Sequence, residues 1–380
     1  MAAQNDSSSP AGAAASRCEP LRNTRRGGTP EGVEHPKGWE FPGSWFVYVG
    51  MDNDEIATFR MDPASGALSP IARSPAGRHP SFLAFAPSKR FVYAVNEFSN
   101  ELAAFSIDRA SGALSCLNRV STLGAEPAFV SVDASGKWVL AANYRSGPVV
   151  VFPVRPDGAL GAPTDVKTTG KHPHAIVLDR SNEFAFVPNK GSDKISQFGF
   201  DATSGKLVAS SPSEIATPAG SEPRHLAFHP LDDFVYVIEE SGCHVETYAL
   251  DARAGTLSHL GSISTLPPGD PASSNTGSDV HVAPSGKFLY GSNRGHDSIV
   301  IYAIGKGGKL TLVGHESTRG KTPRNFGIDP TGTFLFVANQ DSRTLASFRI
   351  DSSRGTLEHL ATIAMPASPY WVGAVTLLGG

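Results

Sequence analysis

The sequence predicts an all-β protein, a seven-bladed β-propeller with four antiparallel strands in each blade. Three observations predict this fold: a phrase of two alternating strands that recurs along the chain, a spacing of about 46 residues between copies, and a first copy whose missing strand stands at the other end of the chain. The 380 residues include 39 glycines and 29 prolines, which suits many short strands joined by tight turns.

The repeated unit is an alternating strand, a turn rich in Pro, Gly, Asp or Ser, and a second strand, as in HPSFLAFAPSKRFVYAVNE and TPRNFGIDPTGTFLFVANQ. A third apolar strand follows, as in ELAAFSID, and a Gly-containing turn such as RASGALSCL leads to a fourth. Measured at the penultimate residue of each phrase, the spacings are 46, 47, 46, 50, 54 and 46 residues. These penultimate residues are Gly50, Asn96, Asn143, Asn189, Glu239, Asn293 and Asn339.

The first copy, SWFVYVGMD, has no first strand in front of it, whereas SPYWVGAVTLL near the end of the chain has the pattern of one. A C-terminal strand that completes the first blade closes the ring, and closure removes the sheet edges that invite aggregation. We therefore expect one propeller domain over residues 44–380. Residues 1–43 are rich in Ala, Ser, Gly and Pro, and we expect them to be disordered.

Composition narrows the classes of partner. The formal charge of −3 reflects nearly balanced acidic and basic residues, whereas a nucleic-acid binder carries an excess of basic ones. No apolar run reaches the roughly 18 residues of a membrane span. Three scattered cysteines are too few for a disulfide framework or a zinc site, which favours a reducing, cytoplasmic setting. We expect a monomer or a weak homo-oligomer.

Two positions of the repeat are predicted to meet at one end of the central channel. The first strand of a blade lines the channel and the second runs antiparallel to it, so the first strand begins where the second ends. The residues that follow the start of the first strand are Ser81, Ala128, His174, Arg224, Arg324 and Tyr370, and Ser278 followed by Asp279 in the divergent blade. The residues that end the second strand are Met51, Glu97, Tyr144, Lys190, Glu240, Arg294 and Gln340.

Together these positions predict a single concavity that holds several cations, two carboxylates and a histidine. Each of these residues taken alone could be a solvated turn residue. As a group, three arginines at one rim favour an anionic ligand, because guanidinium groups pair well with carboxylate or phosphate. A histidine and a glutamate beside them could supply acid–base chemistry. The chain has no Gly-x-Ser-x-Gly elbow and no phosphate-binding P-loop, so we do not expect a serine nucleophile.

Other polar residues are assigned structural roles. The recurrent asparagines are typical of turns, and Asp193 and Asp297 are expected to bind backbone amides there. His225 should alternate to the side of its strand opposite Arg224 and be a packed or hydrogen-bonded core histidine, and His229 and His281 are expected to be structural. His172 and His174, two apart on a strand, could be metal ligands, but no acidic or cysteine cluster supports them, so neither metal nor cofactor is expected.

Four phrases, HPHAIVLD, EPRHLAFHP, LYGSNRGHDSI and TPRNFGIDPTGTFLFVANQDS, resemble the lactonase family of seven-bladed propellers over nearly all of the chain from about residue 44. Its members include the bacterial propeller-type 6-phosphogluconolactonases and the fungal carboxy-muconate cyclases. The resemblance implies a shallow central active site with four catalytic residues, His174, Arg224, Glu240 and Arg294. Two places depart from the pattern of many relatives: Asn189-Lys190-Gly191 stands for Asp-Leu-Gly, and Glu239-Glu240-Ser241 for Asn-Glu-Leu.

The resemblance implies hydrolysis of a sugar lactone, with 6-phosphogluconolactone of the pentose phosphate pathway as the expected substrate. His174 or Glu240 is the general base in this hypothesis, and Arg224 and Arg294 hold the oxyanion or a carboxylate. We expect a small anionic substrate, with the phosphate held by Lys190 and Arg324. Glu97 and Gln340 are further candidates for substrate binding. The alternatives are lactonisation of carboxy-cis,cis-muconate by the same rim, and a non-catalytic binding propeller, although the blades lack the Trp-Asp pairs of scaffold propellers.

Overall fold

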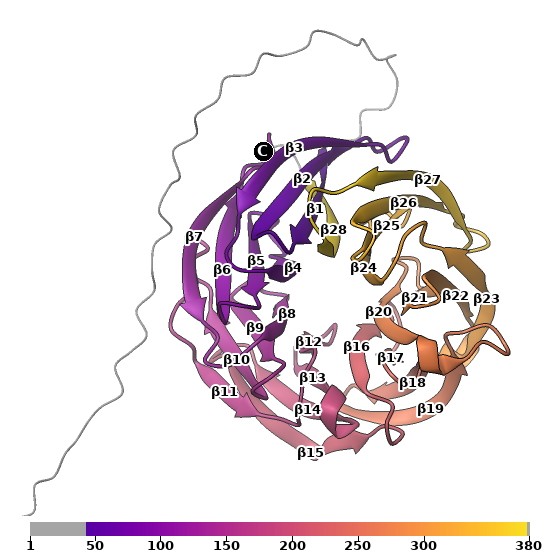
Figure 1. Ribbon diagram of the computed structural model, residues 1–380. Helices are drawn as coiled ribbons and strands as arrows, with labels where there is room; N and C mark the ends of the chain where they lie inside the picture. The colour runs from indigo at the N-terminus through magenta and orange to yellow at the C-terminus, as the bar shows by residue number, and fades with distance from the viewer. Residues whose placement is uncertain (1–42, 378–380) are drawn as a thin grey trace, which may run out of the picture.

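The computed structural model describes residues 43–377, which form a closed ring of seven four-stranded antiparallel sheets (Figure 1). The predicted seven-bladed propeller is thus confirmed. The disorder expected for the N-terminal segment concerns residues outside the described range. Each blade is named below by its position in the ring, with its strands ordered from the hub, the centre of the ring, to the outside.

Blades 1 to 3 contain the first eleven strands together with the last one. Blade 1 consists of β28 (Pro369–Leu377), β1 (Ser44–Met51), β2 (Glu55–Met61) and β3 (Leu68–Pro75). Blade 2 consists of β4 (Pro80–Phe85), β5 (Phe91–Asn96), β6 (Glu101–Ile107) and β7 (Leu114–Ser121). Blade 3 consists of β8 (Pro127–Val132), β9 (Trp138–Asn143), β10 (Pro148–Pro153) and β11 (Asp165–Thr168).

Blades 4 and 5 follow in chain order, and the short β12 is extended toward the rim by an isolated bridge between Pro173 and Asn189. Blade 4 consists of β12 (Val177–Leu178), β13 (Phe184–Asn189), β14 (Lys194–Asp201) and β15 (Lys206–Ala216). Blade 5 consists of β16 (Pro223–Phe228), β17 (Phe234–Glu239), β18 (His244–Asp251) and β19 (Thr256–Ser264).

Blades 6 and 7 complete the ring. Blade 6 consists of β20 (Thr276–Val282), β21 (Phe288–Arg294), β22 (Ser298–Ile304) and β23 (Leu310–Ser317). Blade 7 consists of β24 (Pro323–Ile328), β25 (Phe334–Asn339), β26 (Thr344–Ile350) and β27 (Leu357–Ala364). Three short 3-10 helices lie in the loops, η1 (Lys190–Ser192), η2 (Ala272–Ser274) and η3 (Lys306–Gly308). None of these described helices has the length or the hydropathy to cross a lipid bilayer.

The C-terminal strand closes the ring as predicted. Strand β28 pairs antiparallel with β1 over its whole length, from Ser44 opposite Leu377 to Gly50 opposite Trp371 (Figure 1). Blade 1 is therefore built from both ends of the propeller, and its sheet has the same four-stranded form as the others.

The hydrophobic core is divided into seven clusters, one at each junction between neighbouring blades. The cluster between blades 1 and 7, for example, joins Val47 and Val49 to Phe336, and all three side chains are fully buried. Apolar surface removed from water contributes about 25 cal/mol per Å². Because the second strand of each blade packs on both faces, its residues are apolar without strict alternation.

A glycine in the turn between third and fourth strands repeats in all seven blades and contacts the preceding blade. A Cβ on Gly112 of blade 2 would stand 2.5 Å from the ring of Phe46 in blade 1, and one on Gly66 would meet Phe334 across the closing junction at the same distance. Both glycines have positive φ, 71° and 75°, which other residues rarely adopt. Tyr48 adds a hydrogen bond of 2.7 Å to the carbonyl of Gly112.

The recurrent asparagines hold the connections between blades, which confirms their assignment to turns. The side-chain amide of Asn96 donates to the carbonyl of Ala76 at 3.0 Å, and that of Asn339 donates to Thr318 at 2.8 Å. Asp193 accepts the backbone amides of Gly220 and Glu222 at 2.8 and 2.9 Å, so its prediction is also confirmed. Asp297 does the same for the amide of Thr322.

Candidate active site

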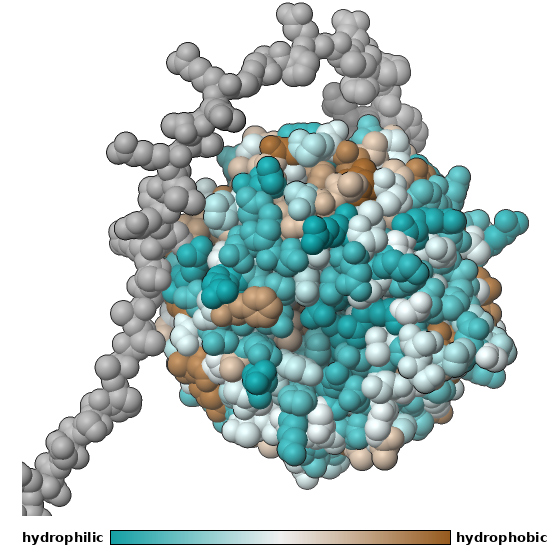
Figure 2. Space-filling view, in the orientation of Figure 1, coloured by the Kyte–Doolittle hydropathy of each residue, from teal (hydrophilic) through white to brown (hydrophobic). Residues whose placement is uncertain are grey.

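The site rim is the end of the hub where first strands begin and second strands end. Within a blade, a backbone hydrogen bond joins the start of the first strand to the end of the second. In blade 5 the amide of Glu240 donates to the carbonyl of Glu222 at 2.8 Å, and in blade 2 the amide of Glu97 donates to the carbonyl of His79 at 3.0 Å. Hydrophilic residues dominate the middle of the molecular face in Figure 2. The two registers predicted to converge do meet at this rim.

A β-bulge directs the residue after the first-strand proline. In blade 5 the pairing of β16 with β17 shifts between Pro223 and His225, which leaves Arg224 as the extra residue. The same shift occurs between Pro80 and Phe82 and at the corresponding points of blades 3 and 7. Bulges re-aim side chains next to functional sites, and here they place one side chain from each of these blades over the hub.

Glu240 is the centre of a group that we call the basic cluster, which consists of Lys190, Arg224, Glu240 and Arg294. Its carboxylate oxygens lie 2.9 Å from Nζ of Lys190, 3.0 Å from Nε of Arg224 and 3.1 Å from Nη2 of Arg294. Lys190 also lies 3.3 Å from Glu222. Blades 4, 5 and 6 thus contribute three cations around one carboxylate.

Electrostatics decides the protonation of this cluster. Burial alone would raise the pKa of Glu240, but Arg224, Arg294 and Lys190 outweigh it and lower the pKa to about 2. Burial, with a further contribution from Arg294, lowers the pKa of Arg224 to about 9, so its guanidinium stays charged at neutral pH. Glu240 is therefore a fixed counter-ion and a very weak base.

His174 lies beside the basic cluster in blade 4, with 7% of its surface exposed. Its ring makes edge contacts with Tyr144 and His225 at centroid distances of 5.4 and 5.0 Å. Its Nδ1 atom is buried and has no hydrogen-bond partner within residues 43–377. Burial and then the charge of Arg224 lower its pKa well below 6.5, so the imidazole is neutral at physiological pH.

His225 corrects one sequence prediction. It is a buried, hydrogen-bonded histidine as expected, with Nδ1 2.7 Å from Oδ1 of Asp279. It does not lie on the side opposite Arg224, because the bulge breaks the alternation of β16 and directs both residues to the hub. Its ring is 5.3 Å from Phe129 and 3.4 Å from Nη1 of Arg224, so it forms the floor beneath the site.

Asp279 connects residues of three blades beneath the site. Besides His225 it accepts hydrogen bonds from Nε2 of His281 at 3.0 Å and from the amide of Asn325 at 2.5 Å. The charge of Asp279 outweighs the effect of burial and raises the pKa of His281. His229 bonds the carbonyl of Gly286 in the next blade at 2.9 Å. The structural roles predicted for His229 and His281 are confirmed by these contacts.

On the side of blades 7, 1 and 2 the rim has a second group, which we call the acceptor cluster: His79, Glu97, Tyr370 and Gln340. Nε2 of His79 lies 3.5 Å from Oε2 of Glu97, and its ring contacts that of Tyr370 at 4.2 Å. Gln340 ends the equivalent strand in blade 7. The guanidinium of Arg324 lies 4.7 Å above the ring of Tyr370.

His79 and Glu222 were missed by the sequence comparison. Both precede the proline that starts a first strand, and both have positive φ, 63° and 59°. A comparison of the repeats one residue earlier would have found them, because this position carries His79, Glu126, His172, Glu222 and Thr322 in blades 2, 3, 4, 5 and 7.

The predicted residues separate into two groups at the same rim. His174, Arg224, Glu240 and Arg294 lie together, and Lys190 joins them through Glu240. Of the remaining predicted substrate-binding residues, Glu97 and Gln340 belong to the other side of the rim. Arg324 lies between the two groups, because its charge acts on His174, Arg224 and Arg294 as well as on His79. In the described residues no group of three or more His, Cys, Asp or Glu side chains could hold a metal ion.

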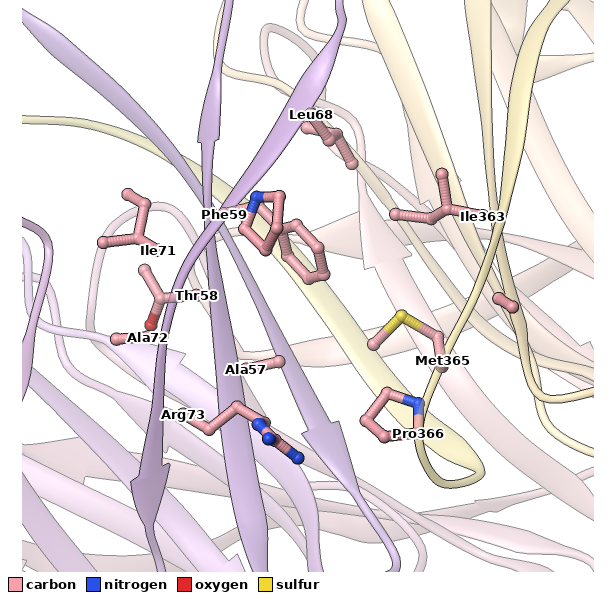
Figure 3. A pocket seen from close by; sticks show the side chains of 12 residues that line it. Ala57, Thr58, Phe59, Leu68, Ile71, Ala72, Arg73, Ile363, Met365 and Pro366 are labelled. Atoms are coloured by element: carbon pink, nitrogen blue, oxygen red, sulfur yellow. The ribbon is translucent and has the colours of Figure 1, made fainter. Parts of the chain in front are cut away.

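A groove on the outer wall offers a different kind of surface. It measures about 570 Å³ between blades 1 and 7, and Figure 3 shows Phe59, Ile363 and Met365 around it. Its one ionisable side chain, Arg73, lies 3.5 Å from Glu55. The groove lacks the groups needed for acid–base chemistry, which are found at the hub.

Fold and site together define an enzyme-like propeller with a cluster of charged side chains at one end of its hub. The chain belongs to the family described as lactonase, 7-bladed beta-propeller, whose model matches residues 46–373. A 6-phosphogluconolactonase of Bacillus subtilis is 33% identical over 334 residues, which cover 84% of this chain and 94% of the relative. A 6-phosphogluconolactonase of Pectobacterium carotovorum is 34% identical over 259 residues, covering 68% of this chain and 77% of the relative.

Solved structures show the same likeness. A periplasmic gluconolactonase of Pseudomonas aeruginosa superposes with a TM-score of 0.81 at 28% identity and covers 88% of this chain and 99% of its own. A Bacteroides fragilis protein provisionally named 6-phosphogluconolactonase superposes with a TM-score of 0.82 at 29% identity, and the match covers 89% of this chain and 100% of that protein.

Proposed function

We propose that this protein hydrolyses a sugar lactone of the gluconolactone type to its open-chain acid, with 6-phosphogluconolactone as the first substrate to test. The observation that carries the proposal is the basic cluster beside a neutral, buried histidine with an unpartnered nitrogen. The names of the curated relatives and of the solved gluconolactonase support the same chemistry.

The geometry favours His174 over Glu240 as the general base. The oxygens of Glu240 face three cations, and its pKa of about 2 makes it a poor proton acceptor. His174 is neutral at pH 7 and has a free nitrogen, so it can take a proton without first losing one. Its low pKa also makes the imidazolium, once formed, a strong acid.

The reaction then follows from these positions. His174 removes a proton from water while the water oxygen attacks the lactone carbonyl, and the guanidinium groups of Arg224 and Arg294 stabilise the oxyanion. The ester bond to the ring oxygen breaks, and that oxygen takes the proton from His174. The new carboxylic acid releases its proton to solvent. Glu240 keeps the two arginines and Lys190 in place despite their mutual repulsion.

The assay is lactone hydrolysis measured as proton release and corrected for spontaneous hydrolysis. We expect His174→Ala and Arg294→Ala each to lower kcat by about 10²- to 10³-fold. Arg145→Ala is the control, because Arg145 is an exposed rim arginine paired with Glu126 at 3.0 Å. Intact kcat with only a raised KM in His174→Ala would remove the acid–base mechanism.

The setting of the reaction is part of the same proposal. We propose a cytoplasmic setting, and activity on the 6-phosphate, the substrate in the names of the curated relatives, would place the reaction in the pentose phosphate pathway. Fractionation of the source cells, followed by detection of the protein, tests the location. Recovery outside the cytoplasm, as the name of the Pseudomonas relative indicates for that protein, would contradict it.

A further inference from the structure

The acceptor cluster contains polar atoms that lack partners. Nδ1 of His79, Oε2 of Glu97 and Oε1 of Gln340 are buried and make no hydrogen bond in the described part of the protein, and the same is true of Oγ of Ser81. His79 is 3% exposed and Ser81 5%. Because native proteins rarely leave buried polar atoms unsatisfied, four such atoms at three neighbouring repeat positions of one rim indicate positions that a ligand completes.

The imidazole of His79 is held rigidly. Its ring stacks on Phe98 at a centroid distance of 4.2 Å and meets the edge of Tyr370 at the same distance. Its backbone amide donates to Asp54 at 2.9 Å. At 3.5 Å, Nε2 of His79 and Oε2 of Glu97 are too far apart for a good hydrogen bond. This arrangement is preorganised for a small polar group that contacts both side chains.

The chemistry of these atoms favours a hydroxyl group over a phosphate. A carboxylate such as Glu97 only accepts hydrogen bonds, and the amide nitrogen of Gln340 is directed to Asp341 at 3.1 Å, which leaves its oxygen as an acceptor. A sugar hydroxyl can donate to these oxygens and accept from the imidazole. A phosphate group offers almost only acceptors and carries a charge that Glu97 repels.

The ion pairs of the rim cations also favour a hydroxyl group over a phosphate as the ligand. Lys190 faces both Glu240 and Glu222, and Arg224 and Arg294 face Glu240. Of the four cations that the repeat comparison placed at the rim, Lys190, Arg224, Arg294 and Arg324, only Arg324 makes no ion pair among the described residues, and it lies over Tyr370. A phosphate at this side of the hub would therefore meet one free guanidinium beside a carboxylate, whereas tight phosphate sites gather several donors.

We infer that the acceptor cluster binds the hydroxyl-bearing end of an unphosphorylated sugar lactone, so that the enzyme does not require a phosphate ester. This inference rests on the proposed hydrolysis and names its substrate class. The reacting carbonyl lies at the basic cluster, and the polyol end of the same molecule lies against His79 and Glu97 on the other side of the hub.

The first test compares kcat/KM for glucono-1,5-lactone and for its 6-phosphate. We expect the unphosphorylated lactone to be hydrolysed with a kcat/KM at least equal to that of the phosphate ester. A preference of 100-fold or more for the 6-phosphate overturns the inference while leaving the lactonase proposal intact. Absence of activity on both lactones overturns the proposed function, and the inference with it.

The second test changes the charge of the cluster. We expect Glu97→Lys to lower kcat/KM for the unphosphorylated lactone at least tenfold, mainly through KM, and to shift the preference toward the 6-phosphate. Glu126→Lys is the matched control, because Glu126 is a rim carboxylate paired with Arg145 away from the cluster. Thermal melts check that both variants fold. If Glu97→Lys, or the milder Glu97→Gln, has the same substrate preference as the control, the acceptor cluster does not bind substrate.

Discussion

Replacing Glu239 by asparagine is expected to stabilise the protein, and to do so more strongly at alkaline than at acidic pH. Glu239 is 2% exposed and stands at the repeat position where five other blades have asparagine. Burial, followed by the neighbouring carboxylate of Glu246, raises its pKa to about 7, and its Oε1 atom has no hydrogen-bond partner among the described residues. Glu246 itself lies 2.5 Å from His259.

The magnitude follows from the two pKa values. Each pKa unit corresponds to about 1.36 kcal/mol, so the difference between 4.5 and about 7 corresponds to about 3 kcal/mol. Solvent in the adjacent 210 Å³ pocket screens part of this, and we expect about 1 to 2 kcal/mol. Because the folded pKa is raised, the native state holds the proton more tightly. The contribution of protonated Glu239 to stability is therefore complete below pH 4.5 and is lost as the pH rises through about 7.

Urea unfolding of both proteins at pH 5 and pH 8.5 measures the effect. Asparagine has no charge to bury, so the free energy of unfolding of Glu239→Asn should exceed that of the parent by about 1 to 2 kcal/mol more at pH 8.5 than at pH 5. Glu358→Asn, on the exposed face of β27, is the control and should show no such dependence. An equal difference at both pH values would refute the reasoning that a buried carboxylate is charged at alkaline pH.

Three further predictions concern the site and the turns. The acid limb of kcat/KM should lie well below pH 6.5, because burial and then the charge of Arg224 lower the pKa of His174, and a limb at or above pH 6.5 in a pH–rate profile would contradict this. Glu240→Gln should lower kcat/KM at least 100-fold and the free energy of unfolding by about 3 kcal/mol, because it removes the carboxylate that pairs with the buried Arg224 and with Arg294 and Lys190, and near-normal kinetics would exclude that role. Asp329→Ala should cost about 3 kcal/mol in urea unfolding, because the carboxylate accepts the amides of Thr331, Thr333 and Phe334, and a loss below 1 kcal/mol would show that water replaces these bonds.

The ring and the meeting of registers could be predicted because the chain repeats. Seven copies of one pattern can be compared with each other, and a residue such as Arg294 that departs from a shared turn is visible without any other sequence. Strand closure was equally visible, since SWFVYVGMD lacks a partner that the C-terminal segment supplies.

The details of the site could not be predicted because they depend on local geometry. Alternation placed His225 away from the hub, and a single bulged residue, Arg224, reverses that placement. The choice between His174 and Glu240 as base required knowing how many cations surround each carboxylate oxygen. His79 lies just outside the registers compared, at a position whose backbone conformation only the folded turn reveals.

The pairing of Ser44 with Leu377 places the first and last strands of the propeller side by side, so the two ends of the propeller lie next to each other. A short linker could therefore join these ends, and the chain could be opened at an outer turn of another blade without removing a strand. Such circular permutants would keep every side chain of the hub in place while moving the break from blade 1 to a blade of choice. The order in which the blades are synthesised could then be varied independently of the pocket, which separates what folding requires from what the reaction requires.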